Sequence, residues 1–241
     1  MKWLQSYIRI ILLVAVISVS SYAGEIESLG GWEGDSHGVG YGYFGLGTDI
    51  VGSEKLSLIS RLTGSYLYYN FDKLDSSIEF KSPGVSLLMG FKIAIKKSTL
   101  ILLSGAEYRW NREDIRTIST GLTEIQRKNK LGAVFQGFLF TPLASRTQFM
   151  LLLNYDGSNQ YIFSRLTLKQ EFSGRAPAVG LEGTAQGNDD ISSIQVGAFI
   201  ESPRMFEALS LKLSGGYKKS WLPEDLQESS AYAGLSFYGR F

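Results

Sequence analysis

Residues 231–240 read AYAGLSFYGR, and the character of the side chain changes at every step. Ala231, Ala233, Leu235 and Phe237 are apolar, and the residues between them are small or polar. Because successive residues of a strand point to opposite faces, this segment would have one apolar face and one polar face. A strand that lies between lipid and the lumen of a barrel has this pattern.

The same alternation recurs along the chain. Residues 209–218 place leucines opposite Lys212 and Lys218, and residues 85–95 are apolar at every odd position. Most such segments have about ten residues or more, the length that a tilted strand needs to cross a bilayer. No segment after residue 23 approaches the roughly 18 consecutive apolar residues of a spanning helix, which excludes a helical membrane protein.

Counting the segments between turn signals predicts about twelve strands, and a count of ten is also compatible with the pattern. The expected fold is therefore all-β: an antiparallel, up-and-down transmembrane β-barrel. The expected strands cover residues 25–35, 38–51, 56–71, 78–95, 98–111, 122–141, 145–156, 160–172, 176–187, 190–202, 207–221 and 229–241.

The connections between these segments alternate in length, as expected when both chain ends are periplasmic. The inner turns are short, at residues 52–55, 96–97, 142–144, 173–175 and 203–206. Several outer connections are longer and more polar, at residues 72–77, 112–121 and 222–228.

The first residues carry the signals of export. Lys2 and Arg9 precede an apolar stretch at residues 10–17, and Ser21 and Ala23 end a run of small residues. This order predicts a signal peptide, residues 1–23, that directs export through the Sec pathway and is cleaved after Ala23. Residues 24–241 would then form one barrel domain in the outer membrane of a Gram-negative bacterium, in contact with its lipid.

Composition narrows the possible functions. The formal net charge is +1, with 20% charged residues. This composition gives no sign of the large basic surface that nucleic-acid binding requires. The chain has no cysteine, which rules out a disulfide framework. Its 27 glycines, 5 prolines and 13% aromatic residues fit many strands joined by short turns.

Alternation sends charged side chains of both signs toward the lumen. They are Arg61, Lys92, Glu107, Arg109, Arg165, Lys169, Glu182, Glu201, Lys212 and Arg240. Twelve strands lie between the eight whose lumen side chains fill and the sixteen or more that leave an open channel. Charges that pair with one another and fill the space are favoured over a selective ion path, because half-buried charges need partners.

Aromatic residues gather near the expected outer ends of the strands, as interfacial anchors do. They are Trp32, Tyr69, Phe71, Trp110, Tyr155, Tyr161 and Trp221. Aromatic rings also stack on sugars, so a glycan-binding surface is an alternative. The candidate binding residues, in the lumen or at its mouth, are Trp32, Arg61, Trp110, Glu182 and Lys212.

The sequence gives little support for a catalytic site or a metal site. His37 is the single histidine, so a surface hydrolase would have to use its imidazole, but Gly34, Asp35 and Ser36 beside it are typical of a polar turn. Residues 187–190, GNDD, offer oxygen ligands but lack the spacing of a calcium loop. We expect no catalytic residue, no metal and no cofactor.

Two stretches resemble the cellulose biosynthesis protein BcsS family. Residues 179–190, VGLEGTAQGNDD, and 194–199, IQVGAF, are similar to the family's G-x-E, G-N and V-G-A-F segments in order. Residues 31–36, GWEGDS, with the glycine- and tyrosine-rich residues 38–47, are similar to its first hairpin. The resemblance implies a non-enzymatic barrel that assists cellulose biosynthesis or export, with cellulose or its synthesis machinery as partner. A surface hydrolase, and a small pore or adhesion barrel, remain the alternatives.

Overall fold

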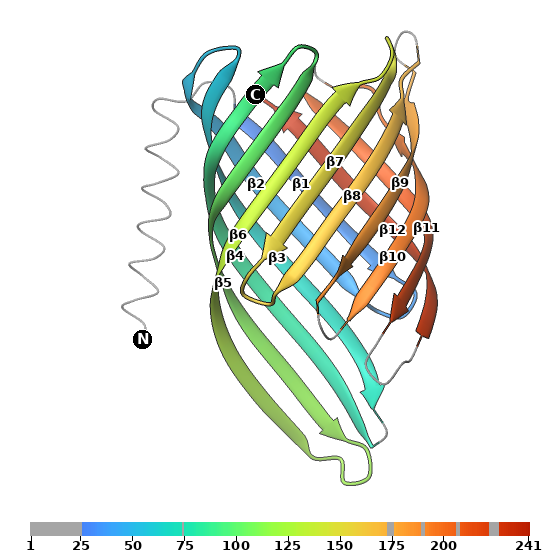
Figure 1. The fold of residues 1–241 in the computed structure, drawn as a ribbon. Helices are drawn as coiled ribbons and strands as arrows, with labels where there is room; N and C mark the ends of the chain where they lie inside the picture. Colours follow the sequence, from blue (N-terminus) through green and yellow to red (C-terminus); the bar gives the residue numbers. More distant parts are fainter. Residues whose placement is uncertain (1–25, 74, 173–175, 189–190, 206–207, 222–226) are drawn as a thin grey trace.

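The computed structural model describes residues 26–241 except 74, 173–175, 189–190, 206–207 and 222–226. Within these residues twelve antiparallel strands form a closed barrel, in which each strand pairs with its neighbours in sequence and the first pairs with the last (Figure 1). The strands are β1 (Ile26–Asp35), β2 (Gly40–Gly52), β3 (Leu56–Lys73), β4 (Ser76–Ile95), β5 (Ser98–Thr117), β6 (Thr123–Pro142), β7 (Thr147–Asp156), β8 (Tyr161–Gln170), β9 (Ala178–Gly187), β10 (Ser192–Glu201), β11 (Leu209–Trp221) and β12 (Gln227–Arg240). The predicted up-and-down barrel is confirmed, and the count is twelve.

The largest departure from the predicted boundaries lies at the end of β5. Residues 112–117 were expected in a polar loop, but β5 continues to Thr117 and pairs with β4 on one side and β6 on the other. Both faces of residues 112–117 are polar because both contact water. The segment is nevertheless a strand, since β4 and β6 satisfy its backbone hydrogen bonds.

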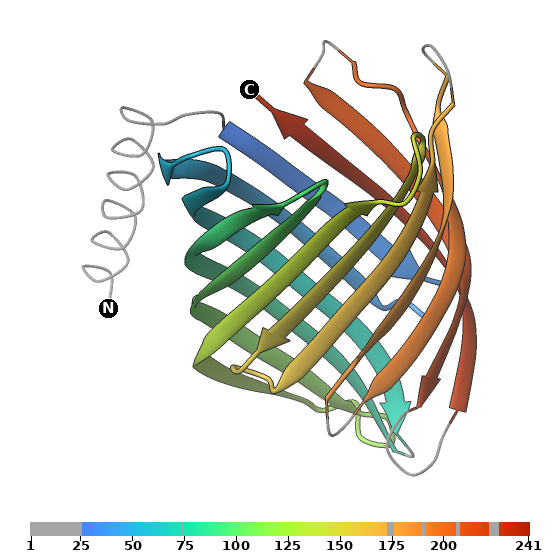
Figure 2. The same ribbon diagram turned by 45° about the horizontal axis from the view of Figure 1, so that its top comes forward.

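Both described ends of the chain lie at one end of the barrel, the terminal end. There the amide of Ile26 donates to the carbonyl of Phe241 at 2.7 Å, and the amide of Phe241 donates back at 2.8 Å. The β2–β3 and β4–β5 turns lie at this end, and the β1–β2 and β3–β4 turns lie at the opposite, distal end (Figures 1 and 2). The signal peptide and the predicted turn at 173–175 lie outside the described residues.

The outside of the barrel carries an apolar band. Leu87, Leu102 and Leu213 are about half exposed there, at 53%, 48% and 57%. A continuous apolar surface of this kind is unfavourable in water and matches the hydrocarbon layer of a bilayer. Among the described residues, no helix has the length and apolarity to span a membrane.

Four strands continue beyond the barrel at the distal end. β2 pairs with β3 only as far as Tyr68, and β7 pairs with β6 only from Val134. Beyond these points β3, β4, β5 and β6 form a projecting sheet, which we call the wing: residues 69–73, 75–83 and 109–131 (Figure 1). Residues 123–131 of β6 have no paired strand on their outer side among the described residues.

The apolar core lies inside the barrel against β3–β6. Ile59, Leu88, Ile101, Leu103 and Val134 are buried together, with Phe138 packed against them. The interior along β9–β12 is polar by contrast, with buried Glu182, Gln195 and Lys218. The lumen therefore has an apolar cluster on its β3–β6 side, next to charged residues of the same strands, and a mainly polar β9–β12 side.

Candidate functional site: the lumen and its distal mouth

The main cavity of the described structure has a volume of about 1720 Å³ and extends from the lumen onto the inner face of the wing. Nine of the ten charged residues expected in the lumen line it, and Glu182 lies inside through its contact with Lys212. The alternation of the sequence thus placed these ten charges correctly. It missed others that line the same cavity, among them Glu27, Glu33 and Asp156.

One ion pair crosses the lumen. Nη2 of Arg165 on β8 lies 2.7 Å from Oε2 of Glu33 on β1, and four strands separate β8 from β1 along the shorter path around the barrel. Nε of Arg165 donates to Thr184 at 3.2 Å, and its guanidinium lies 5.2 Å from the Phe163 ring centre. These contacts fix the guanidinium in the path through the barrel.

Arg61 makes a second connection between separated strands. Its Nη1 donates to Oε1 of Gln136 at 2.6 Å, and its Nη2 lies 3.9 Å from Oε2 of Glu27. This links β3 with β6 and β1. Nε of Arg61 and Oε1 of Gln195 are buried without a hydrogen-bond partner among the described residues.

Glu182 is the centre of a packed group that we call the Glu182 cluster: Glu182, Lys212, Tyr232 and Phe199. Lys212 donates to Glu182, the Tyr232 hydroxyl donates to it at 3.2 Å, and Nζ of Lys212 lies 4.4 Å from the Phe199 ring centre. Glu182 is 3% exposed, so its charge depends on these partners.

Two glycines make room for this cluster. A Cβ on Gly180 would lie 2.3 Å from Cζ of Phe199, and a Cβ on Gly197 would lie 2.2 Å from the Tyr232 hydroxyl. Larger residues at these positions would displace the ring or the phenol.

The distal half of the lumen also carries paired charges. Nε of Arg109 lies 2.9 Å from Glu107 and 3.0 Å from Asp156, and all three side chains are buried. Lys218 donates to Asp35 at 2.7 Å. Burial of charges is tolerated here because each ion has a partner of opposite sign.

The five candidate binding residues do not form one site. Arg61, Glu182 and Lys212 lie in the lumen, whereas Trp32 lies on the outer face over Gly40 and Gly42. Trp110 is also on the outer face, edge-on to Tyr108 with ring centres 4.7 Å apart. The strand positions of the two tryptophans have the opposite parity to those of the lumen residues, although Trp32 also borders the main cavity. Ligand binding at the five residues stays a prediction.

Two members of the predicted aromatic girdle face the cavity and not the lipid. Tyr69 and Tyr161 line the cavity and face inward, while Trp32, Trp110 and Tyr155 are exposed on the outer face. The side chain of Phe71 lies outside the described part of the structure. Parity within a strand separates the two sets of aromatics, which the sequence argument had grouped by their distance from the strand ends.

Contacts of His37 are those of a polar turn. Asp35 accepts hydrogen bonds from the amides of His37 and Val39, each at 3.0 Å. The ring places Nε2 3.0 Å from the carbonyl oxygen of Ser229 and Nδ1 3.8 Å from Glu228. No serine hydroxyl hydrogen-bonds to the imidazole among the described residues.

Metal ligands are sparse in the part of the chain that the structure covers. There, no three histidine, aspartate or glutamate side chains converge enough to hold an ion. Asp189 and Asp190 of the GNDD stretch lie outside the described residues. Asn188 beside them accepts a hydrogen bond from the amide of Ile191 at 2.9 Å, a turn contact.

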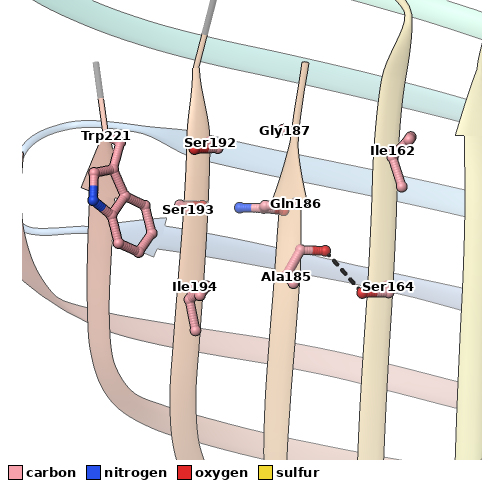
Figure 3. Close-up of a pocket in the computed structure, with 9 residues that line it drawn as sticks. All are labelled: Ile162, Ser164, Ala185, Gln186, Gly187, Ser192, Ser193, Ile194 and Trp221. Carbon is pink, nitrogen blue, oxygen red and sulfur yellow. Dashed lines mark hydrogen bonds between the residues drawn. The ribbon is translucent and has the colours of Figure 1, made fainter. Parts of the chain in front are cut away.

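A shallow groove of about 350 Å³ lies on the β8–β11 side of the barrel near the distal end (Figure 3). Trp221 and Ile162 lie at opposite sides of the group of residues that line it, with Ser192, Ser193, Gln186 and Gly187 between them (Figure 3). The hydroxyl of Ser164 is satisfied by the Ala185 carbonyl at 3.1 Å. A polar group thus satisfied locally is compatible with an apolar surrounding.

A family model for cellulose biosynthesis protein BcsS matches residues 14–241. The chain belongs to the BcsS family. The stretches that resemble the family contain Gly180, Glu182, Gly197 and Phe199, and these residues build or make room for the Glu182 cluster. In this BcsS family member these four residues are therefore part of the packing of the lumen wall.

Solved structures with the same fold are distant in sequence. The beta domain of the Bordetella autotransporter BrkA has 10% identity and a TM-score of 0.52, covering 91% of this chain and 98% of that one. The translocator domain of the autotransporter NalP from Neisseria meningitidis has 12% identity and a TM-score of 0.49, covering 98% and 96%. No curated protein matches the chain. The BrkA likeness shows the fold alone, that of an outer-membrane barrel.

Proposed function

We propose that this BcsS family protein is a non-enzymatic accessory barrel of the outer membrane that assists cellulose biosynthesis at the cell surface. Family membership supports the link to cellulose, and the apolar outer band supports a membrane location. With both termini periplasmic after Sec-dependent export, the wing extends from the cell surface. Its partners are outer-membrane lipid and either cellulose or the cellulose-synthesis machinery.

The Glu33–Arg165 ion pair is the observation that favours an accessory role over a role as a conduit for the glucan. A glucan chain moving through the lumen would have to separate this pair, and separating half-buried charges is costly without replacement partners. Arg61 adds a further obstacle through its contacts with Gln136 and Glu27. An accessory protein needs no open path and uses an exposed surface instead.

Deletion of the gene tests the role in cellulose production. We expect secreted and cell-bound cellulose to fall in the deletion strain and to return when the full-length gene is restored. Unchanged cellulose in the deletion strain would contradict the proposal.

Single-channel recording tests the closed lumen. We expect the wild-type barrel to show no large stable conductance in planar bilayers, and Arg165→Ala to increase it by removing the group that crosses the lumen. Lys219→Ala, at an outward position of β11, is the matched control. A large wild-type conductance would favour the conduit or the general-pore alternative.

The non-enzymatic part of the proposal is tested at His37. This ring lines the mouth of the main cavity and contacts Glu228, so it is the position from which a surface hydrolase would act. We expect the purified protein to hydrolyse neither phospholipid nor lipopolysaccharide. Hydrolysis that His37→Ala abolishes would instead establish an enzyme.

A further inference from the structure

One row of four residues crosses the inner face of the wing. Tyr69 pairs with Phe80, Phe80 with Glu113, and Glu113 with Gln126, so the four are successive neighbours on β3, β4, β5 and β6. All four line the main cavity. With neighbouring strands about 4.8 Å apart, the row is roughly 14 Å long.

The two aromatic residues of the row form a stacked pair. The ring centres of Tyr69 and Phe80 are 4.6 Å apart and their planes differ by 16°. Both side chains are half-buried, which leaves ring surface open to the cavity. Such a surface suits a flat, weakly apolar ligand, since ring faces attract C–H groups.

The polar half of the row continues from this pair. Glu113 is half-buried and makes no hydrogen bond or ion pair with any other described residue, unlike the paired carboxylates of the lumen. Gln126 beside it contacts only Glu124 among described side chains, at 3.1 Å. Lys128 pairs in register with Asn111 one step toward the barrel and also faces the cavity. Acceptors and donors therefore stand beside an aromatic surface.

We propose that the row Tyr69, Phe80, Glu113 and Gln126 binds a β-linked glucan chain. The sugar rings of such a chain present flat faces of C–H groups and carry hydroxyl groups along their edges. The faces would stack on the Tyr69–Phe80 pair, while Glu113 accepts and Gln126 donates and accepts hydrogen bonds at the hydroxyls. The inference rests on the proposed role in cellulose production and assigns that role a binding surface.

Binding of cellohexaose by the purified barrel in lipid nanodiscs tests this site, with maltohexaose as the α-linked comparison. We expect saturable binding of cellohexaose and at least tenfold weaker binding of maltohexaose. Tyr69→Ala should raise the dissociation constant about tenfold, and Glu113→Gln should raise it about threefold.

Matched controls lie on the opposite face of the same sheet. Tyr68 neighbours Tyr69 on β3, and Glu79 neighbours Phe80 on β4, yet both alternate to the outer face, where Glu79 pairs with Lys81 at 2.8 Å. Tyr68→Ala and Glu79→Gln should leave cellohexaose binding unchanged. Folding of every variant is verified by its heat-dependent gel migration before binding is measured.

Absence of cellohexaose binding to the wild-type barrel would overturn the inference, as would equal effects of Tyr69→Ala and Tyr68→Ala. Equal binding of the two hexasaccharides would overturn the β-glucan assignment. The deletion strain separates this result from the broader proposal: cellulose that falls without any cellohexaose binding refutes the site alone. Specific binding with unchanged cellulose refutes the role in biosynthesis and leaves a surface glucan receptor.

Discussion

The barrel and the wing share the strands β3–β6 but differ on both faces. Inside the barrel charged side chains pair across the lumen, as Arg165 does with Glu33, whereas Glu113 on the inner face of the wing has no described partner. Outside, Leu102 of the barrel gives way to Arg112 of the wing along one strand, β5. Inward and outward side chains alternate without a break along β5. The change from an apolar to a charged outer face therefore marks a change of surroundings from lipid to water.

Ion pairs on the outer face of the wing support this boundary. Arg112 lies 2.8 Å from Asp114, and its hydrogen bond lowers the pKa of the Asp114 carboxyl below the ordinary value. This carboxylate stays charged at neutral pH, which suits water and would be costly against hydrocarbon. The bilayer edge is therefore expected between Leu102 and Arg112, near Tyr108 and Trp110.

The largest effect is expected from breaking the Glu182 cluster. Glu182→Ala leaves Lys212 and Tyr232 without their shared acceptor and should lower the free energy of unfolding by about 3 to 5 kcal/mol. Urea unfolding in phospholipid vesicles, followed by tryptophan fluorescence, measures it. Glu79→Gln on the wing should change it by less than about 0.5 kcal/mol. A similar loss in both variants would mean that the cluster has no special structural role.

The next effect tests the boundary between lipid and water. Leu102→Arg places a charge in the apolar band and should cost about 2 to 4 kcal/mol. Ile125→Arg lies on the same outer face but in the wing, where the cost should be about 0 to 1 kcal/mol. The same unfolding assay compares them. Equal costs would show that the wing does not project beyond the bilayer.

A smaller effect is expected at a glycine of the lumen wall. Gly197→Ala brings a methyl group against the Tyr232 hydroxyl and the Gly215 carbonyl, and should cost about 1 to 3 kcal/mol. Gly64→Ala meets no atom within 4 Å and is the matched control. Unfolding midpoints of the two variants should differ clearly, and equal midpoints would contradict the packing argument.

The smallest effect on barrel stability should follow from shortening the wing. Replacing residues 115–124 by Asn-Gly joins Asp114 to Ile125, which are already register partners. The barrel should lose less than about 1 kcal/mol, because the removed residues contact only the wing's own strands. Vesicle unfolding again gives the value, and a loss comparable with that of Glu182→Ala would show that the wing supports the barrel.

Much of the fold was predictable because each strand separates two different environments. Lipid outside and polar groups inside impose a period of two, which identified the twelve strands and many of the inward charges, although Glu33 was missed. The length of β5 was not predictable in the same way, because Asp114 and Arg116 lie where both faces meet water. There the pattern no longer distinguishes a strand from a loop.

The candidate site was less predictable, since its contacts join distant strands. The alternation along β8 shows that Arg165 faces inward. Its contact with Glu33 depends on the stagger of the strands around the barrel, which the alternation does not give. Alternation in residues 231–240 puts Tyr232 on the polar face of its strand, but it does not reveal the hydrogen bond to Glu182. Tyr69 was assigned to the outer aromatics because its distance from the strand end, rather than its parity, was considered.

The exposed side of β6 has a consequence for how copies of this protein associate. On the side away from β5, residues 123–131 have a row of backbone donors and acceptors with no strand partner among the described residues, which is a template for edge-to-edge pairing between molecules. Arg127, Lys128 and Lys130 lie in this segment and repel the same segment of a second copy. That repulsion is screened over about 10 Å at 0.1 M salt and over about 3 Å at 1 M. In a bilayer or in detergent micelles, copies of the protein are therefore expected to self-associate through the wing more readily as ionic strength rises.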